Sequence, residues 1–194
     1  MLLENIIEAA IMAANNPLTV ADIQKLFEEN TVPSTADIKN AIQVLRERYA
    51  ATSLEIQEVA SGFRFQVKTG YAPALSRLWA ERPPRYSRAF LETLSLIAYR
   101  QPITRAEIEE IRGVAVNSYI MKTLSEREWI RVIGHKDLPG KPALYGTTKT
   151  FLDYFNLKSL DELPTLAELK NLDSQEAKLQ VQLELVQTEF EHEE

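Results

Sequence analysis

NPLTVADIQKLF at Asn16–Phe27 returns as QPITRAEIEEIR at Gln101–Arg112. When the two stretches are aligned on their prolines, they share a Pro, a Thr, an Ala, an acid and two aliphatic residues. The aligned pairs are Pro17 and Pro102, Thr19 and Thr104, Ala21 and Ala106, Asp22 and Glu107, Ile23 and Ile108, and Leu26 and Ile111. Self-similarity at a long interval is typical of a chain that contains one structural unit twice. The repeat therefore predicts two small domains of similar fold.

The first copy lies in a pattern of three helices and a hairpin. An apolar stripe at helical spacing ends before Pro17 and predicts a first helix. Thr19, with an acid three residues later, can cap a short second helix, and Ser34 can begin a third helix at Ser34–Ala50. Two alternating runs around a turn at Ser61–Gly62 then predict the strands of a β-hairpin, at Leu54–Ile56 and Phe63–Val67. This order predicts a winged helix-turn-helix.

The second copy repeats this order. An apolar helical stripe ends before Pro102, and Thr104 with Glu107 can form a capping box. Gly113 suits the left-handed turn that ends a helix. The remaining elements that we expect are a third helix, two strands and a final helix, at Ala115–Arg127, Ile130–Ile133, Ala143–Tyr145 and Thr148–Phe155.

The fold class that these patterns predict is mainly α with small β-hairpins (α+β), arranged as two tandem winged helix-turn-helix domains. We expect the first domain at residues 1–80 and the second at residues 87–164. The linker between them, residues 81–86, contains two adjacent prolines and is expected to be stiff and extended. Residues 165–194 form an acidic tail, for which partial helix and disorder both stay open.

Composition and charge exclude several classes of function. The chain of 194 residues has no cysteine, which excludes a disulfide framework and a thiolate metal site. No apolar stretch is long enough to cross a bilayer, so we expect no membrane partner and a cytoplasmic location. Ten acids and three bases between Leu157 and Glu194 give that end a charge of −7, and the net charge of −6 leaves the rest close to neutral. The basic footprint that usually marks DNA binding is therefore missing.

The sequence carries no constellation that predicts catalysis. Its two histidines, His135 and His192, stand without an evident partner to orient them as bases. Gly134, Gly140 and Lys141 resemble a phosphate-binding loop only in part, because the spacing is one residue too long and a proline follows the lysine. We therefore predict no enzyme activity, no cofactor and no metal.

The third helices leave two classes of function open. In a helix-turn-helix protein this helix enters the major groove of DNA. Here its charges nearly cancel in both units, with Lys39, Arg46 and Arg48 against Asp37 and Glu47 in the first, and Lys122 and Arg127 against Glu126 in the second. Protein contact or simple packing is therefore favoured, and the alternative is a tandem winged-helix transcription regulator that binds DNA directly.

Three stretches of the second unit resemble the signature of a bacterial family, segregation and condensation protein B. They are Thr93–Val114, Pro139–Thr148 and Phe151–Pro164. The first unit is similar more loosely, and the tail after Leu169 is not similar. Lys141 stands where the family usually has Arg. A lysine keeps the positive charge but lacks the planar guanidinium that forms a bidentate contact. Asn156 stands where the family often has Gly, which Asn can replace in a left-handed turn.

The resemblance implies a non-enzymatic accessory subunit of the bacterial condensin, which compacts and segregates chromosomes during cell division. In that family the first winged-helix domain mediates homodimerisation. The second binds the kleisin subunit, segregation and condensation protein A, and through it the SMC ATPase. A location at the nucleoid and weak or indirect DNA contact would follow from membership of such a complex.

The residues suggest where each contact lies. Polar and aromatic side chains gather at expected turns of the second unit, where core packing alone does not require them. We therefore expect the kleisin contact at Arg112, Gly113, Asn117, Lys141 and Tyr145. The first unit carries more apolar side chains than one small core would use, so we expect the homodimer contact at Leu3, Ile7, Ile11, Phe63 and Phe65.

Overall fold

The computed structural model describes residues 2–75, 78 and 86–165 of the chain. Residues 81–85 of the expected linker lie outside the described residues, as does the expected tail from residue 166 onward. The chain divides into two compact units, Met1–Leu160 and Asp161–Glu194. Both copies of the repeated sequence lie in the first of these units, so the division into domains at residues 1–80 and 87–164 stays a prediction.

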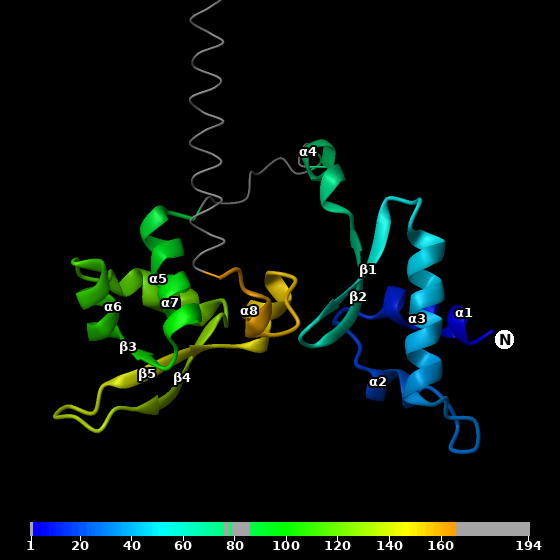
Figure 1. The fold of residues 1–194 in the computed structure, drawn as a ribbon, viewed down its shortest axis with the longest axis horizontal. Coiled ribbons are helices and arrows are strands. Elements are labelled where there is room, and N and C mark those ends of the chain that lie inside the picture. The colour runs from blue at the N-terminus through cyan, green and yellow to red at the C-terminus, as the bar shows by residue number, and fades with distance from the viewer. Residues whose placement is uncertain (1, 76–77, 79–85, 166–194) are drawn as a thin grey trace, which may run out of the picture. The chain divides into compact units, whose positions relative to one another are not determined.

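The first repeat, residues 3–67, consists of three helices followed by a hairpin (Figure 1). Its elements are α1 (Leu3–Ala13), α2 (Val20–Gln24), α3 (Thr35–Tyr49), β1 (Leu54–Val59) and β2 (Gly62–Val67). A short 3₁₀ turn and a one-turn helix follow, at η1 (Thr69–Tyr71) and α4 (Ala72–Leu75). The two strands pair antiparallel from Leu54 with Val67 to Val59 with Gly62, and a bridge between Leu18 and Phe63 brings the start of the repeated sequence alongside them.

Side chains close both ends of the main helix of this repeat. Ser34 and Asp37 form a capping box in which the Ser34 Oγ accepts a hydrogen bond from the Asp37 N–H at 3.1 Å. At the other end, the ammonium of Lys68 donates to the carbonyl oxygens of Tyr49, Ala50 and Thr52, at 3.2, 2.6 and 2.7 Å. Carbonyls at the end of a helix have no following helical turn to donate N–H groups to them. Lys68 therefore acts as a side-chain cap on the end of α3.

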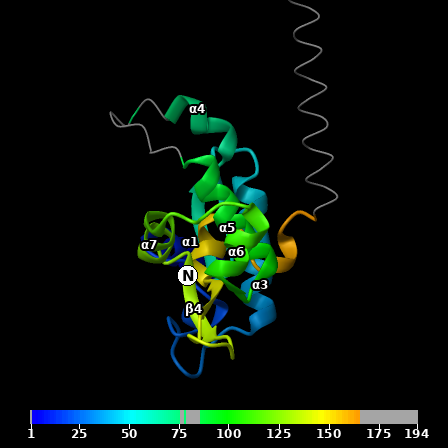
Figure 2. The ribbon, with the colours of Figure 1, turned by 90° about the vertical axis from the view of Figure 1, so that its left-hand side faces the viewer.

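The second repeat, residues 88–158, has the same order with one added strand. Its elements are α5 (Arg88–Arg100), β3 (Ile103–Thr104), α6 (Arg105–Arg112), α7 (Ser118–Glu126), β4 (Ile130–His135), β5 (Ala143–Thr147) and α8 (Lys149–Tyr154), and a 3₁₀ turn follows at η3 (Leu160–Glu162). The three strands lie in the order β3-β5-β4, with both pairings antiparallel. In both ribbon views the loop between β4 and β5 lies away from α5, α6 and α7 (Figures 1 and 2).

Trp129 is the centre of the aromatic packing in this repeat. It is 2% exposed, and its ring lies 6.1 Å from Phe90, 4.5 Å from Tyr154 and 5.4 Å from Phe155, measured between centroids. The Arg127 guanidinium stacks over the same ring at 5.5 Å. This packing fixes α8 against α5 and the start of β4.

The fold class is confirmed: the chain is mainly helical with small antiparallel hairpins. The designation of each repeat as a winged helix-turn-helix stays a prediction. The third helix of the second repeat begins at Ser118 and not at Ala115, because the Asn117 side chain accepts the Tyr119 N–H at 2.9 Å and caps the helix there. The first hairpin turns at Ala60–Ser61 and not at Ser61–Gly62, because Gly62 already pairs with Val59.

Candidate functional site

The turn between α6 and α7 brings three of the predicted kleisin-contact residues together. Arg112 is the last residue of α6, and Gly113 follows it with a left-handed backbone (φ 69°) that ends the helix. Asn117 then caps α7. Between them, Val116 is buried and anchors the turn to the core.

Two charged residues of α6 brace this turn. The Arg105 guanidinium donates to the Val116 carbonyl at 2.6 Å and to the Glu109 carboxylate at 3.0 Å. The same carboxylate accepts the Val116 N–H at 2.9 Å. The pKa of Glu109 is lowered, first by this main-chain hydrogen bond and then by Arg105, because both favour the charged carboxylate. The turn that carries Arg112 is therefore held by its own helix.

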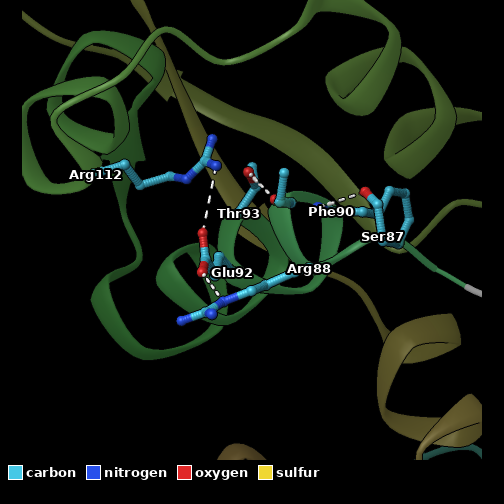
Figure 3. Close-up of polar contacts among 7 residues, drawn as sticks. Ser87, Arg88, Phe90, Glu92, Thr93 and Arg112 are labelled. Atoms are coloured by element: carbon cyan, nitrogen blue, oxygen red, sulfur yellow. Dashed lines mark hydrogen bonds and ion pairs between the residues drawn. The ribbon is translucent and has the colours of Figure 1, made fainter.

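The Arg112 side chain points from α6 toward α5 (Figure 3). Only 10% of it is exposed, yet its ion pair within the described part of the chain is a long contact of 3.4 Å from Nη2 to the Glu92 carboxylate. The other oxygen of Glu92 accepts from Arg88 at 2.8 Å, as Figure 3 shows. The Arg112 Nε has no hydrogen-bond partner among the described residues. A guanidinium this buried usually has more acceptors, so Arg112 retains hydrogen-bonding capacity.

Exposed apolar side chains lie on the elements around this turn. Leu91 lies on α5 next to Glu92, Ile111 and Val114 flank Arg112 and Gly113, and Tyr119 is the second residue of α7. Their exposed fractions are 43%, 52%, 56% and 69% in that order. We call these four residues with Arg112 the α6–α7 surface. Exposed apolar residues around a charged group are typical of a protein-contact surface.

The structure does not bring Lys141 and Tyr145 to this turn. Lys141 is exposed in the loop between β4 and β5, where its N–H donates to the Leu138 carbonyl at 2.8 Å. Tyr145 is half-buried in β5, opposite Ile103 of β3 and Val132 of β4. Because α6 begins directly after β3 and spans about 12 Å, Arg112 lies at the far end of that helix from Tyr145. The predicted site therefore divides into a turn and a hairpin.

The predicted dimer residues belong to the interior of the first repeat. Ile7, Ile11 and Phe63 are 0%, 3% and 6% exposed and form part of one core cluster. Leu3 and Phe65 are partly buried and pack against the same cluster. The apolar excess that suggested a dimer contact is used within the core, so Ile7, Ile11 and Phe63 are not available on the surface. Leu3 and Phe65 keep part of their side chains exposed, so a homodimer contact at those two residues stays a prediction.

The two arginines of α3 have partners within the chain. Arg46 donates to the Ile56 carbonyl at 3.2 Å and lies over the Phe63 ring. Arg48 forms a 2.7 Å ion pair with Glu8, whose carboxylate also accepts the Tyr49 hydroxyl. The pKa of Tyr49 is raised, chiefly by this bond to Glu8. These contacts fix α3 to α1 and β1 and leave few cations free on the helix.

No cluster of three or more potential metal ligands occurs among the described residues. His135 ends β4 in an exposed position, and His192 lies outside the described residues. Within residues 2–75, 78 and 86–165, no helix has the length and hydropathy needed to span a bilayer.

Sequence reasoning missed the residues that support the turn. Glu92, Arg105 and Glu109 were not among the expected site residues. The four-residue spacing of Arg105 and Glu109 on one helix was a usable signal for an ion pair. Nothing in the local pattern placed Glu92 opposite Arg112, because that contact joins two helices.

The fold and the site define a mainly α protein with two hairpin-bearing repeats and an exposed apolar surface at one helix turn. Residues 5–166 match the family described as "Segregation and condensation complex subunit ScpB". The chain therefore belongs to the segregation and condensation protein B family, an accessory subunit in chromosome partition and condensation.

Two relatives in other bacteria agree with this assignment by sequence. A "Segregation and condensation protein B homolog" of Coxiella burnetii is 57% identical over 181 residues, covering 93% of this chain and 87% of the relative. A "Segregation and condensation protein B" of Enterococcus faecalis is 46% identical over 143 residues, covering 71% and 70%. The crystal structure of ScpB from Mycobacterium tuberculosis aligns at 26% identity with a TM-score of 0.36, covering 79% of this chain and 94% of that one.

Proposed function

We propose that this chain is the kleisin-binding accessory subunit of a bacterial SMC complex and acts without catalysis of its own. The kleisin, segregation and condensation protein A, binds the second repeat, and the first repeat mediates homodimerisation. Through the kleisin the chain joins the SMC ATPase at the nucleoid in the cytoplasm, where it serves chromosome condensation and segregation in dividing cells.

The observation that carries the kleisin contact is the α6–α7 surface. It combines exposed apolar side chains with a guanidinium that has one long ion pair and an unused donor. An amphipathic helix of the kleisin would cover the apolar side chains and offer carbonyl or carboxylate oxygens to Arg112. The exposed Lys141 gives the hairpin a separate cation that a longer partner segment could reach.

The alternative function, direct DNA binding by a transcription regulator, has weaker support. A helix-turn-helix protein that binds DNA needs basic side chains on its third helix that are free to reach phosphates and bases. On α3, Arg46 and Arg48 are engaged with Ile56, Phe63 and Glu8. On α7, Lys122 pairs with Glu126 at 3.6 Å. Affinity for duplex DNA that falls steeply with salt would revive this alternative.

The test is calorimetric titration of the full chain with segregation and condensation protein A of the same organism. We expect Tyr119→Ala and Arg112→Ala each to weaken the complex by about tenfold or more, since large side chains at the centre of an interface dominate its affinity. Lys141→Ala and Tyr145→Ala test the hairpin separately.

Arg88→Ala is the matched control, because Arg88 pairs with the same Glu92 carboxylate but is 93% exposed and lies off the turn. Its affinity should equal that of the unaltered chain. Unchanged affinity in a folded Tyr119→Ala variant would remove the contact from the α6–α7 surface. For the first repeat, a monomer mass of the full chain at micromolar concentration would contradict the homodimer.

A further inference from the structure

The turn of the first hairpin is covered, unlike the turn of the second. Ala60, Ser61 and Gly62 are all half-buried, whereas residues 137–141 of the second hairpin are all exposed. Hairpin turns normally lie on the surface. The first turn is covered by residues 153–158, the end of α8 and the chain that follows it, within the same unit Met1–Leu160.

The hairpin turn contributes main-chain donors to this contact. The β1–β2 ladder ends where Val59 pairs with Gly62, so the N–H groups of Ala60 and Ser61 have no partner in the ladder. The Ala60 N–H donates to the Leu157 carbonyl at 2.9 Å, and the Ser61 N–H donates to the Asp153 carboxylate at 2.9 Å. Both donors are therefore satisfied by residues more than 90 positions away in the sequence.

The end of α8 contributes acceptors. The last carbonyls of a helix have no N–H partner one turn further on. Arg64 Nη2 donates to the Asp153 carbonyl at 2.9 Å and to the Asn156 side-chain oxygen at 2.6 Å. Gln57 donates to the Asn156 carbonyl at 3.3 Å. Asn156 has a left-handed backbone (φ 59°) that turns the chain back so that it presents both oxygens.

We propose that residues 57–64 and residues 153–158 form an intramolecular latch that joins the two repeats. N–H groups that the strand ladder leaves free at one hairpin turn bond to oxygens at one helix end, and an ion pair of 3.1 Å between Glu58 and Lys158 lies beside them. Water replaces such hydrogen bonds when they break, so each contributes little net stability. The latch therefore holds the repeats together while leaving them able to separate, as is usual for polar contacts between parts of one chain.

A disulfide trap tests the latch in the full chain, which has no cysteine of its own. The main-chain hydrogen bond between Ala60 and Leu157 brings their Cα atoms within the reach of a disulfide. Mild oxidation of the Ala60→Cys, Leu157→Cys variant should cross-link nearly all of it within one chain, as measured by mass and by a peptide map. The control pair is Val67→Cys with Leu157→Cys, which should stay reduced because Val67 lies at the opposite end of β2.

The remaining outcomes overturn the proposal. Free thiols in the oxidised Ala60→Cys, Leu157→Cys variant would show that the contact does not form in solution. A cross-link found only between two chains would show that the contact belongs to a dimer and not to a single chain.

A second measurement assigns the contact to its side chains. Asn156→Gly removes the acceptor amide but keeps the turn, because glycine tolerates a positive φ. Placed in the cysteine pair, Asn156→Gly and Arg64→Ala should each slow cross-linking by about fivefold, and the double variant should be no slower than Arg64→Ala alone, since both remove the same bond. Multiplied effects, or rates equal to those of the parent pair, would overturn the role of Arg64.

Discussion

The two hairpins begin from the same order of elements and end in different surroundings. In the second hairpin, main-chain groups of the loop bond to one another. The N–H of Lys136 donates to the Pro142 carbonyl at 2.9 Å, that of Leu138 to the Lys136 carbonyl at 2.9 Å, and that of Lys141 to the Leu138 carbonyl at 2.8 Å. The first turns over two residues and has no loop to accept its N–H groups, which bond instead to Asp153 at the end of α8 and to Leu157 just after it. A duplicated fold therefore need not present duplicated surfaces, because loop length decides whether a hairpin tip is self-contained or requires a partner.

The largest effect that would test this comparison is at the two tip glycines. Gly62 has φ 128°, and a Cβ added there would lie 2.3 Å from the Leu18 carbonyl oxygen. Gly140 has φ 83°, and a Cβ there would meet nothing within 4 Å. We expect Gly62→Ala to lower the free energy of unfolding by about 3 kcal/mol or more, from strain and main-chain overlap together. Gly140→Ala should cost about 1 kcal/mol, from strain alone.

Urea unfolding of the full chain at neutral pH measures both glycine variants. Equal losses at Gly62 and Gly140 would mean that the close approach of Leu18 to the first tip is absent in solution.

A smaller difference is expected between the two capping boxes. Thr104 is 2% exposed, and its hydroxyl donates to Glu107 at 2.7 Å, whereas Thr19 is exposed and forms the same pattern with Asp22 at 2.6 Å. Replacing an N-cap threonine by alanine costs about 1 kcal/mol, and more where a buried partner is left unsatisfied. Thr104→Ala should therefore lower the unfolding free energy by about 2 kcal/mol and Thr19→Ala by about 1 kcal/mol. Thermal unfolding that ranks them in the opposite order would contradict this.

The smallest effect concerns pH and sharpens the contrast between the boxes. Lys136, on the loop side of β4, bonds Glu107 at 2.6 Å and, with Thr104, lowers the pKa of that carboxyl from 4.5 to about 2. A lowered folded-state pKa stabilises the fold above pH 4.5, and this contribution is lost as the pH falls toward 2. The pKa of Asp22 is lowered to about 2 chiefly by Lys25, the residue that directly follows the same helix, α2.

We therefore expect Glu107→Gln to flatten part of the fall in stability between pH 4.5 and 2. In Lys136→Met, an NMR titration should find the Glu107 pKa moved up toward 4.5 while that of Asp22 stays near 2. If the Glu107 pKa is the same in Lys136→Met as in the unaltered chain, the bond from Lys136 does not tie the second hairpin to α6.

Much of the local structure could be predicted from the sequence because its signals are short-range. The capping boxes at Thr19, Ser34 and Thr104 start helices where expected, and Thr148 caps the final helix. Gly113 takes the left-handed turn that its position suggested. Each of the four caps depends on a hydrogen bond between residues three apart, which spacing alone reveals.

The rest depends on contacts between distant residues. Ile7 and Phe63 form an apolar pattern that is the same whether the side chain faces its own core or a partner, so the sequence could not distinguish interior from interface. The two-residue strand β3 is too short for a period-2 pattern. Three of the five predicted kleisin-contact residues lie together at the α6–α7 turn, and the placement of Lys141 and Tyr145 on the hairpin required the strand register.

The cap that Lys68 places on α3 also has a consequence for the order of synthesis. A ribosome releases the chain from its N-terminus, so α3 emerges well before the lysine that closes its end. Until β2 has been made, the nascent helix lacks that ammonium at its last carbonyls. The end of α3 is therefore capped only once the chain extends to residue 68, and any shorter fragment leaves those carbonyls without this cation.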